Sequence, residues 1–381
     1  MKIAIDCKNQ VLYGGGIAQW ISDILPSFLE RFKEDEIILI SPNCISANKL
    51  TSYGRKIKLV SWPKKLPLSI KHGLYDNLFF PKAISDIKPD LIFSPYHDVR
   101  MPHKIPYIIT VHDLCYDDVP DTYSKFLRVY RKWLLNKNLK RAYHIITVSK
   151  TTQNHLINKR QVHKNSVSIV PNSLSAEFLV PHLSQTNIEN WKKDYDLFST
   201  GNYLLLYTGG IESRKNLLNL FYSLGLLWDH GEKITLLITG NSDQRWNQLF
   251  SKRINSMEQV KFLGRLTVEQ LHIAYESVDA VVYPSLCEGF GRVCIEAMAC
   301  GTPLACSDLP VFREIAGKYP YYFNPFDIKD MASAILQVCK AGKQIPHIDD
   351  NFSISSARKA FLDVMVPIVT ELRGMTIKRE I

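Results

Sequence analysis

Several features that would assign this chain to a membrane or secreted class are missing. Its 381 residues contain no apolar run close to the ~20 residues that a spanning helix needs. The chain begins with the strand-like Lys2-Ile-Ala-Ile-Asp6, where a leader would have a charged region followed by an apolar one. No disorder-rich stretch interrupts the sequence. We therefore expect a globular protein of the cytoplasm.

The cysteines lack the spacings of a metal site or a disulfide framework. The eight cysteines include no Cys-x-x-Cys pair, and no histidine cluster at ligand spacing accompanies them. Cys287, Cys294, Cys300 and Cys306 fall in segments with the composition of a core. The pattern predicts reduced, structural thiols and no metal site.

Signatures of two other binding classes are also missing. There is no helix-turn-helix, zinc or RNA-binding motif, so we expect no nucleic acid partner despite a net charge of +10. A nicotinamide-dependent oxidoreductase needs Gly-x-Gly-x-x-Gly in its first strand-to-helix turn, with an acidic residue ~20 positions later. Tyr13-Gly-Gly-Gly-Ile17 has a different spacing. No Asp-x-Asp stands in a setting suited to a metal-bound phosphate.

The chain does contain a regular alternation of strand and helix patterns, which predicts parallel sheets covered on both faces. In the first half the predicted strands are Lys2–Ile5, Glu36–Ile40, Ile57–Val60, Leu91–Ser94, Tyr107–Val111, His144–Val148 and Ser168–Val170. The helices predicted between them are Ala18–Phe32, Leu74–Ile87, Lys125–Arg141 and Lys150–Asn158.

A second alternating series follows a break in the pattern. Periodicity is lost from Pro171-Asn172 to about Thr200. Beyond it the predicted strands are Tyr203–Thr208, Thr235–Thr239, Val260–Leu263, Ala280–Tyr283 and Leu304–Ala305, and the predicted helices are Asn216–Trp228, Val268–Glu276, Arg292–Cys300 and one from about Asp330. We predict two Rossmann-like domains, residues 1–173 and 174–354, with their parallel sheets facing a central cleft.

The most informative segment is Glu288-Gly-Phe-Gly-Arg-Val-Cys-Ile-Glu296. It follows an apolar run, Asp279 to Leu286, that is typical of a buried parallel strand, and Gly301 ends the helix that it begins. The backbone can turn sharply at the two glycines, so free N–H groups and a helix N-terminus point at one place, where a diphosphate fits. Glu288 can face a sugar, and Glu296 can accept hydrogen bonds from ribose hydroxyls. Either glutamate alone would more often be a surface charge.

This segment, with its continuation Ala297-Met-Ala-Cys-Gly-Thr-Pro303, closely resembles the Glu-x7-Glu signature of glycosyltransferase family 4. The resemblance covers nearly the full length. It implies the two-domain α/β fold called GT-B and a retaining glycosyltransferase. It also implies that the first domain serves the acceptor, that the second binds the nucleotide-sugar, and that a final helix of about residues 355–381 crosses back to the first domain.

Four further segments match the family pattern. Arg214 and Lys215 follow a predicted strand and a glycine pair, where the resemblance assigns them to the donor diphosphate; exposed charges at a helix start are the alternative. Gly14-Gly-Gly16 resembles the loop that faces the donor phosphate and the acceptor, although it also suits a flexible connection. His112 ends a predicted strand and resembles the family residue that contacts the transferred sugar. Arg265 lies in a segment that resembles the one contacting the base.

The resemblance implies the roles of these residues. The catalytic group is His112, Arg214, Lys215 and Glu288, and the rest of the donor site is Gly15, Gly16, Arg265, Gly289, Phe290, Gly291 and Glu296. The cations, the backbone amides and the helix dipole would stabilise the leaving diphosphate, so we expect neither a divalent metal nor another cofactor. The leaving phosphate would assist deprotonation of the acceptor on the same face, and Glu288 would orient the sugar. Asp6 is left without a role.

Donor and acceptor are less sharply indicated. The Ser285-to-Gly291 form and Pro310-Val-Phe-Arg-Glu-Ile315 resemble mannosyl and deoxyhexosyl transferases of bacterial surface polysaccharides. This implies GDP-mannose or a related GDP-sugar and a lipid-linked saccharide acceptor. A UDP- or dTDP-sugar transferase with a soluble acceptor is one alternative, and a non-catalytic relative that binds sugar or serves as a membrane scaffold is another. Arg292 stands where the family usually has an apolar residue or proline.

Positive charge is concentrated in the first half. Residues 1–180 contain 26 Lys and Arg against 15 Asp and Glu, a net charge of +11, and the remaining residues contain 21 against 22, a net charge of −1. The stretch Lys125–Arg141 has seven basic and no acidic residues, with aromatic residues at helical spacing. It predicts either a helix on an anionic membrane surface, which would make the protein peripheral to the inner face of the cell membrane, or a packing helix with a basic solvated face.

Overall fold

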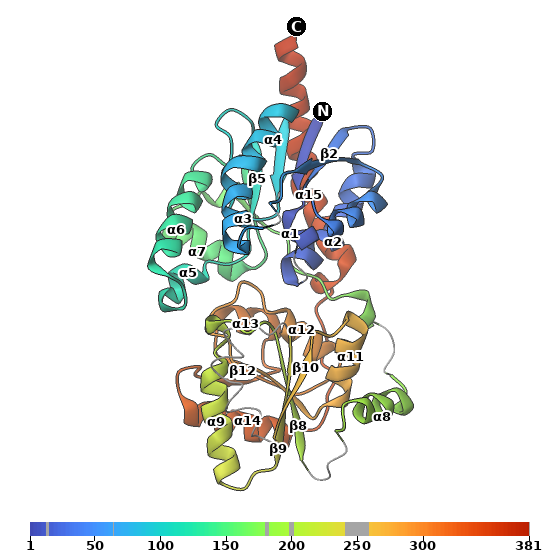
Figure 1. Ribbon diagram of the computed structural model, residues 1–381, viewed down its shortest axis with the longest axis vertical. Helices are drawn as coiled ribbons and strands as arrows, with labels where there is room; N and C mark the ends of the chain where they lie inside the picture. Colours follow the sequence, from blue (N-terminus) through green and yellow to red (C-terminus); the bar gives the residue numbers. More distant parts are fainter. Residues whose placement is uncertain (13–14, 64, 180–182, 198–201, 241–258, 381) are drawn as a thin grey trace. The chain divides into compact units, whose positions relative to one another are not determined.

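The computed structural model in Figure 1 describes residues 1–12, 15–63, 65–179, 183–197, 202–240 and 259–380. Tyr13 and Gly14 of the first glycine loop, and Thr200 at the end of the predicted break, lie outside these ranges. The chain divides into two compact units. Unit 1 comprises Met1–Ser173 with Asp350–Ile381, and unit 2 comprises Leu174–Asp349.

Unit 1 is built on a seven-stranded sheet of order β3-β2-β1-β4-β5-β6-β7, and every paired strand is parallel to its neighbour. The strands β4 and β5 are buried along their whole length, which explains their continuous apolar sequences. The strand bounds are β1 Lys2–Asp6, β2 Glu36–Pro42, β3 Lys56–Val60, β4 Leu91–Ser94, β5 Tyr107–Val111, β6 His144–Thr147 and β7 Val167–Ile169.

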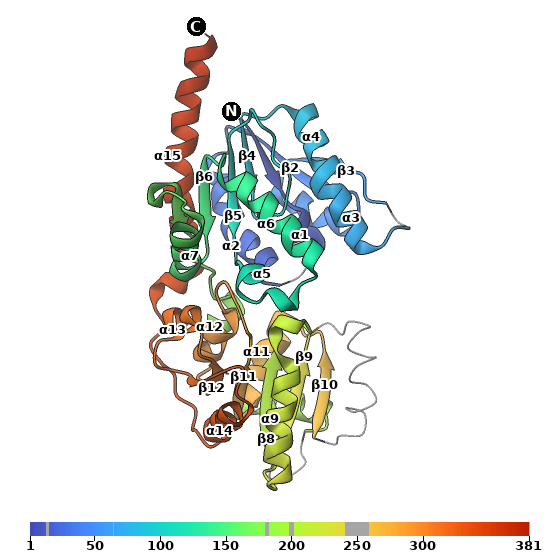
Figure 2. The ribbon, with the colours of Figure 1, turned by 90° about the vertical axis from the view of Figure 1, so that its left-hand side faces the viewer.

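The helices of unit 1 cover this sheet. They are α1 Lys8–Leu12, α2 Gly16–Arg31, α3 Leu68–Leu74, α4 Phe80–Ile87, α5 Cys115–Asp118, α6 Lys125–Leu139, α7 Lys150–Arg160 and α15 Ile354–Glu380. Figure 2 shows α15 as a long helix beside the unit's sheet, where it packs on α2. Phe361 anchors it, because its ring lies 6.3 Å from Trp20, 5.8 Å from Phe28 and 5.2 Å from Phe93 between centroids.

Unit 2 repeats the plan with a six-stranded parallel sheet of order β10-β9-β8-β11-β12-β13. Its strands are β8 Tyr203–Thr208, β9 Ile234–Thr239, β10 Val260–Gly264, β11 Ala280–Tyr283, β12 Leu304–Ser307 and β13 Tyr321–Phe323. Its helices include α8 Gln185–Asp194, α9 Leu217–Asp229, α11 Val268–Ser277, α12 Arg292–Ala299, α13 Pro310–Ala316 and α14 Ile328–Cys339. The predicted α/β class with parallel sheets is confirmed.

The strand order reverses once in each sheet. In unit 1 the chain winds outward from β1 to β3 and then returns to place β4 on the other side of β1. In unit 2 the same reversal puts β11 beside β8. In open α/β sheets the carboxyl ends of strands at such a reversal leave a crevice that ligands use. The fold therefore points to the ends of β1 and β4, and to the ends of β8 and β11.

A few elements differ from the sequence prediction. The helix predicted over Leu74–Ile87 is divided, because a π-helical turn, Tyr75–Phe79, separates α3 from α4. Pro81 lacks an N–H group, and it stands in the first turn of α4, where that loss is tolerated. The short helices α1 and α5, the helices α8 and α13 and the strand β13 were not predicted; β13 has only three residues, too few for a clear alternation.

Two further expectations, on membrane-spanning helices and on the cysteines, can be compared with the structure. Within the described ranges, no helix combines the length and the apolarity needed to cross a bilayer. Cys294, Cys300 and Cys306 are buried free thiols, as the sequence predicts. The same prediction is wrong for Cys287, which is disulfide-bonded.

Candidate functional site

Two loops of unit 2 meet at the reversal between β8 and β11. Arg214 and Lys215 form a short turn after β8, and Glu288 lies in the loop that follows β11. The loops are tied together because the Leu286 N–H group donates to the Arg214 carbonyl oxygen at 2.8 Å. Asn216 ends the turn in a left-handed conformation, with φ of 58°, and α9 begins directly after it. The two cations are thus fixed at the carboxyl edge of the sheet.

The carboxylate of Glu288 is the centre of this site. Its Oε1 atom accepts hydrogen bonds from Lys215 Nζ at 2.5 Å, Ser285 Oγ at 2.8 Å and Arg214 Nη1 at 3.1 Å. Arg214 also donates from Nε to Glu212 at 2.8 Å. The structure therefore brings together three of the four residues predicted to be catalytic.

Burial and charge oppose each other at Glu288. Burial alone would raise its pKa, but the positive charges of Lys215 and Arg214 lower the pKa of this carboxyl to about 2. Glu288 is therefore ionised at neutral pH and has no proton to donate. Burial also lowers the pKa of Lys215, against the opposing effect of Glu288.

The side chain of Lys215 is almost completely enclosed by protein although it carries a positive charge. Only 7% of its surface is exposed. Its Nζ atom donates to the Tyr283 hydroxyl at 3.1 Å and lies 5.1 Å from the centre of the Tyr283 ring. A lysine so enclosed is pre-organised, so little side-chain entropy is lost when an anion joins it.

The N-terminus of α12 adds backbone donors on the Glu288 side of the site. Gly291 is the N-cap residue, with φ of 95°, a conformation that side chains rarely adopt. A Cβ atom at this position would lie 2.6 Å from Cε1 of Phe312. Glycine is therefore required by both conformation and space. Gly289 and Phe290, the preceding residues of the turn, are buried.

Glu296 lies further along α12, in a different set of contacts. Its Oε2 atom accepts a hydrogen bond from the Tyr275 hydroxyl at 2.9 Å, and its Oε1 atom lies 3.4 Å from Arg292 Nε. Arg292 in turn donates to Ser175 Oγ at 2.8 Å. Glu296 shares no recorded contact with Glu288 among the described residues, so the two glutamates of the signature belong to separate hydrogen-bond groups.

Arg265 is the least integrated of the predicted donor-site residues. It follows β10, and its side chain is exposed. Within the described part of unit 2, no hydrogen bond or ion pair is recorded for it, so its prediction as a base contact rests on the sequence alone.

In unit 1, His112 follows β5 and is anchored by its surroundings. Because a carbonyl can only accept, the Nε2–H group donates to the Pro95 carbonyl oxygen at 2.8 Å. The ring packs edge-on against Trp20 at 5.2 Å. Burial lowers the pKa of His112 to about 4, so the ring is neutral at pH 7. These contacts leave Nδ1 as a hydrogen-bond acceptor.

The glycine loop of unit 1 is described from Gly15 onward. Gly15 is the N-cap residue of α2, with φ of 123°, and Gly16 begins the helix. Nothing lies within 4 Å of a Cβ atom placed on Gly15, so the space above this helix N-terminus is open within the described structure.

A buried polar group that was not predicted from the sequence lies at the reversal between β1 and β4. Asp6, the last residue of β1, accepts hydrogen bonds from the hydroxyls of Tyr75 at 2.9 Å and Tyr96 at 2.7 Å. Lys8 Nζ lies 2.5 Å from Asp76 Oδ1 and 4.5 Å from the centre of the Tyr96 ring. The only sequence signal was an aspartate at a strand end, because its partners come from positions about 70 and 90 residues away.

Burial dominates the titration of this group. It raises the pKa of Asp6 against the opposing charge of Lys8, and it raises the pKa of Asp76 to about 7. Such a carboxyl can exchange a proton near neutral pH. The group offers carboxylates, hydroxyls and an ammonium together, which are the groups that recognise sugar hydroxyls.

Comparisons with known families bear on both units. Residues 15–178 match the family described as Glycosyltransferase Family 4, and residues 187–351 match the family described as Glycosyl transferases group 1. The chain is 30% identical over 264 residues to the O-antigen chain mannosyltransferase RfbU of Salmonella typhimurium, covering 68% of each chain. It is 26% identical over 302 residues to O-antigen chain mannosyltransferase B of Escherichia coli, covering 77% of this chain and 76% of that one.

Solved structures share the fold at lower sequence identity. The Anabaena protein Alr3699/HepE, crystallised with UDP and glucose, superposes with a TM-score of 0.71 at 16% identity, covering 96% of this chain and 99% of that chain. WaaG, a glycosyltransferase involved in lipopolysaccharide biosynthesis, superposes with a TM-score of 0.68 at 13% identity, covering 94% of each chain.

Proposed function

This chain belongs to the family 4 and group 1 glycosyltransferases, which have the GT-B fold, and on that premise we propose that it transfers mannose or a related hexose from a GDP-sugar to a lipid-linked saccharide, with retention. The broader statement, that it is a glycosyltransferase of polysaccharide synthesis, follows from its mannosyltransferase relatives. The convergence of Arg214, Lys215 and Glu288 at the reversal of the second sheet carries the proposal.

The diphosphate of the donor is bound by Arg214, Lys215 and the N-terminal amides of α12. These groups supply positive charge where the leaving group develops negative charge, and their positions are fixed before the donor binds. This arrangement supports transfer without a divalent metal. Glu296 takes the ribose hydroxyls, and the exposed Arg265 is available to the base.

The transferred sugar is oriented by Glu288. Glu288 is ionised, so its role is to accept hydrogen bonds from sugar hydroxyls and to hold the two cations. The proton of the acceptor hydroxyl passes to the leaving phosphate. The loop at Gly15 and Gly16 contributes backbone donors.

The donor assignment is tested by thermal shift with GDP, UDP, dTDP and ADP. A nucleotide that binds only the folded protein stabilises it by about 2.7 kcal/mol at a hundredfold excess over its dissociation constant. We expect the largest shift with GDP. A larger shift with UDP or dTDP would favour the alternative donor, and no shift with any nucleotide would favour the non-catalytic alternative.

The site itself is tested by Lys215→Ala, with the exposed Lys329→Ala of the same unit as the matched control. Loss of Lys215 should reduce transfer by at least about tenfold, because a charge-assisted hydrogen bond is worth about 1.5–3 kcal/mol. Lys329→Ala should transfer as the wild type does. Equal activity of both variants with the true donor and acceptor would remove the site assignment.

The second part of the proposal, docking on an anionic membrane, rests on helix α6. Leu134 and Leu135 bury one side of this helix in unit 1. On another side Phe126, Val129 and Trp133, spaced to form one stripe, are exposed by 83%, 64% and 53%. Such a stripe, flanked by lysines and arginines, has the character of a helix that lies in a membrane interface.

The basic residues of α6 do not all serve this surface. Arg131 lies 3.3 Å from Asp98, and Lys132 lies 3.6 Å from Asp117. Their removal would disturb the packing of unit 1 as well as any membrane contact. Two variants leave these ion pairs in place. The charge variant replaces Lys125 and Arg128 with glutamine, and the apolar variant replaces Phe126 and Trp133 with alanine.

Co-sedimentation with vesicles that contain phosphatidylserine decides between a membrane helix and a packing helix. Each basic residue near the surface contributes about 1 kcal/mol, so the charge variant should bind markedly less, and binding should weaken with salt. A control variant with Lys33 and Lys49 changed to glutamine loses the same charge elsewhere in unit 1. Equal pelleting of wild-type protein and both α6 variants would make a soluble acceptor the preferred interpretation.

A further inference from the structure

Three buried side chains of unit 2, none of them used in the proposed transfer, lie close together. His272 and Glu276 are on α11, and Cys300 is the C-cap residue of α12. One ligand atom from each lies within 4.8 Å of the others. They supply imidazole nitrogen, carboxylate oxygen and thiol sulfur, which is a donor set for zinc.

We propose that His272, Glu276 and Cys300 form a zinc-binding site. The four-residue spacing of His272 and Glu276 puts both on one face of α11, where Nε2 lies 3.2 Å from Oε1. Zinc bonds of about 2.0–2.3 Å in tetrahedral geometry require ligand atoms roughly 3.3–3.6 Å apart. The first pair therefore stands near the required separation, and Cys300 Sγ, which lies within 4.8 Å of both atoms, has to move closer to become the third ligand.

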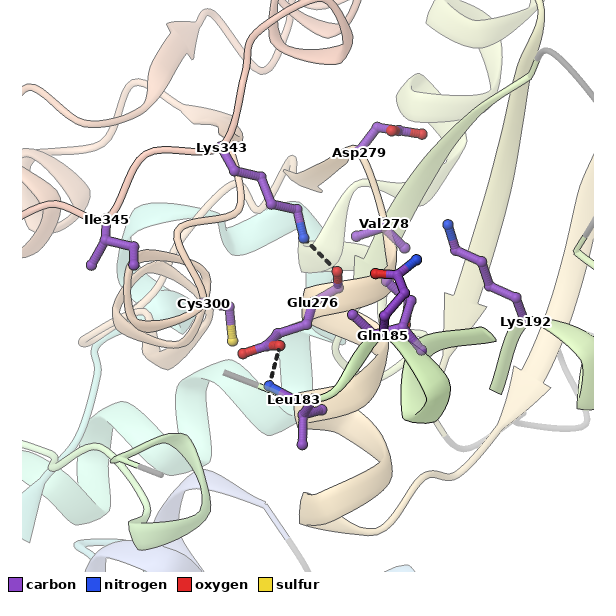
Figure 3. A pocket seen from close by; sticks show the side chains of 11 residues that line it. Leu183, Gln185, Lys192, Glu276, Val278, Asp279, Cys300, Lys343 and Ile345 are labelled. Carbon is purple, nitrogen blue, oxygen red and sulfur yellow. Dashed lines mark hydrogen bonds between the residues drawn. The ribbon is translucent and has the colours of Figure 1, made fainter. Parts of the chain in front are cut away.

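The carboxylate of Glu276 is already oriented for this role. The Leu183 N–H group donates to Oε2 at 2.9 Å, which leaves Oε1 directed at His272. Figure 3 shows the Cys300 sulfur and the Glu276 carboxylate turned toward one another. A backbone donor on the second oxygen is the kind of outer-shell contact that fixes a ligating carboxylate.

The charges of the ligands would balance the charge of a bound zinc ion. Zinc binding would displace the thiol proton of Cys300 to solvent, and the resulting Zn²⁺, thiolate and carboxylate sum to zero net charge beside a neutral histidine. A sulfur ligand selects against magnesium and calcium, which prefer oxygen ligands.

A cavity of about 520 Å³ gives access to the site. Glu276 and Cys300 line it together with Lys343, Ile345 and Leu183. A water molecule from this cavity can complete the tetrahedron. Lys343 lies close by, but its Nζ atom donates to the backbone oxygen of Glu276 and not to the carboxylate (Figure 3).

The site would join the end of α11 to the end of α12. Cys300 stands one helical turn beyond Glu296, and α11 carries Tyr275, the hydrogen-bond partner of Glu296. Zinc would therefore stabilise the helix pair that holds Glu296. Its role is structural, because the site contains none of the residues that we place at the donor phosphates.

The test begins with full-length protein stripped by a chelator and then titrated with zinc alone. The wild type should bind one equivalent and unfold at a higher temperature with zinc, but not with magnesium. Cys300→Ala should lose this equivalent or bind it at least about tenfold more weakly. Cys339→Ala, which removes another buried thiol at a helix end of the same unit, should bind as the wild type does. Equal zinc binding by the wild type and Cys300→Ala would overturn the proposal.

Two further measurements keep the proposal testable if Cys300→Ala does not fold. Cobalt bound to the wild type should give a thiolate-to-metal charge-transfer band, and the absence of that band at one equivalent would overturn the proposal. Lys343→Met removes a positive charge near the metal and should tighten zinc binding. Unchanged or weaker affinity in this variant would place zinc elsewhere.

Discussion

The replacement Glu288→Gln separates two roles that the structure gives to one carboxylate. Oε1 of Glu288 accepts hydrogen bonds from Lys215, Ser285 and Arg214 within 3.1 Å. Glutamine keeps the shape and can still accept at its amide oxygen, but the negative charge is lost. The variant therefore leaves the buried Lys215 without its counter-charge, whereas the half-buried Arg214 keeps its ion pair with Glu212.

The expected cost in stability follows from the pKa of Glu288. The pKa falls from 4.5 to about 2 on folding, and each unit corresponds to about 1.4 kcal/mol, so the ionised carboxylate contributes up to about 3 kcal/mol. Because the folded pKa is the lower one, this stability is present above pH ~4.5 and is lost as the pH falls toward about 2. Urea denaturation should therefore show a large difference between wild type and variant at pH 7 that shrinks below pH ~4.

Nucleotide binding by Glu288→Gln should become tighter, although the folded protein becomes less stable. In the wild type, Glu288 and the donor diphosphate compete for Arg214 and Lys215. Removing the carboxylate charge should therefore tighten GDP binding several-fold, while transfer falls at least about tenfold because the sugar is no longer oriented. Calorimetric titration with GDP and a transfer assay would measure the two effects separately.

The informative outcome is the divergence of these two measurements. Weaker or unchanged GDP binding by Glu288→Gln would refute the idea that its partner cations face the phosphates. A variant with tighter GDP binding and wild-type transfer would retain the phosphate site and remove Glu288 from sugar recognition.

Three further predictions concern the same unit. Glu296→Ala should reduce transfer by at least about tenfold through loss of ribose contacts while the fold is kept, and wild-type kinetics would exclude that role. Transfer should persist in excess EDTA, assayed well below the unfolding temperature; loss of activity that magnesium or manganese restores would contradict metal-independent transfer, whereas loss that only zinc restores would point to the cysteine-containing site. Gly291→Ala should destabilise the protein by about 1–3 kcal/mol, because φ at this position is 95° and the added Cβ would lie 2.6 Å from Phe312. The control Gly317→Ala places its Cβ in open space and should cost less. Equal unfolding midpoints of the two variants would show that the turn at Gly291 relaxes without strain.

Local patterns in the sequence were enough to identify most of the regular elements and the loops of the donor site. Continuous apolar runs such as Ala280–Tyr283 identify strands buried on both faces, because no polar residue is tolerated on either side of them. The turn from Glu288 to Gly291 could be predicted because its N-cap residue, Gly291, is left-handed, a conformation that favours glycine. Such constraints act within a few residues, so they leave a mark in the sequence.

Only the tertiary structure decided which side chains meet. The polar group around Asp6 draws its tyrosines from α3–α4 and from the end of β4, and no local pattern links such distant positions. His272, Glu276 and Cys300 likewise come from two helices, and the i,i+4 pair alone looks like an ordinary surface ion pair. The helical pattern of α6 did not determine that Trp133 is exposed or that Arg131 pairs with Asp98. Helical spacing defines a face of the helix but not what covers that face. The strand order, set by packing across the whole sheet, brings Glu288 to Lys215 although 73 positions separate them.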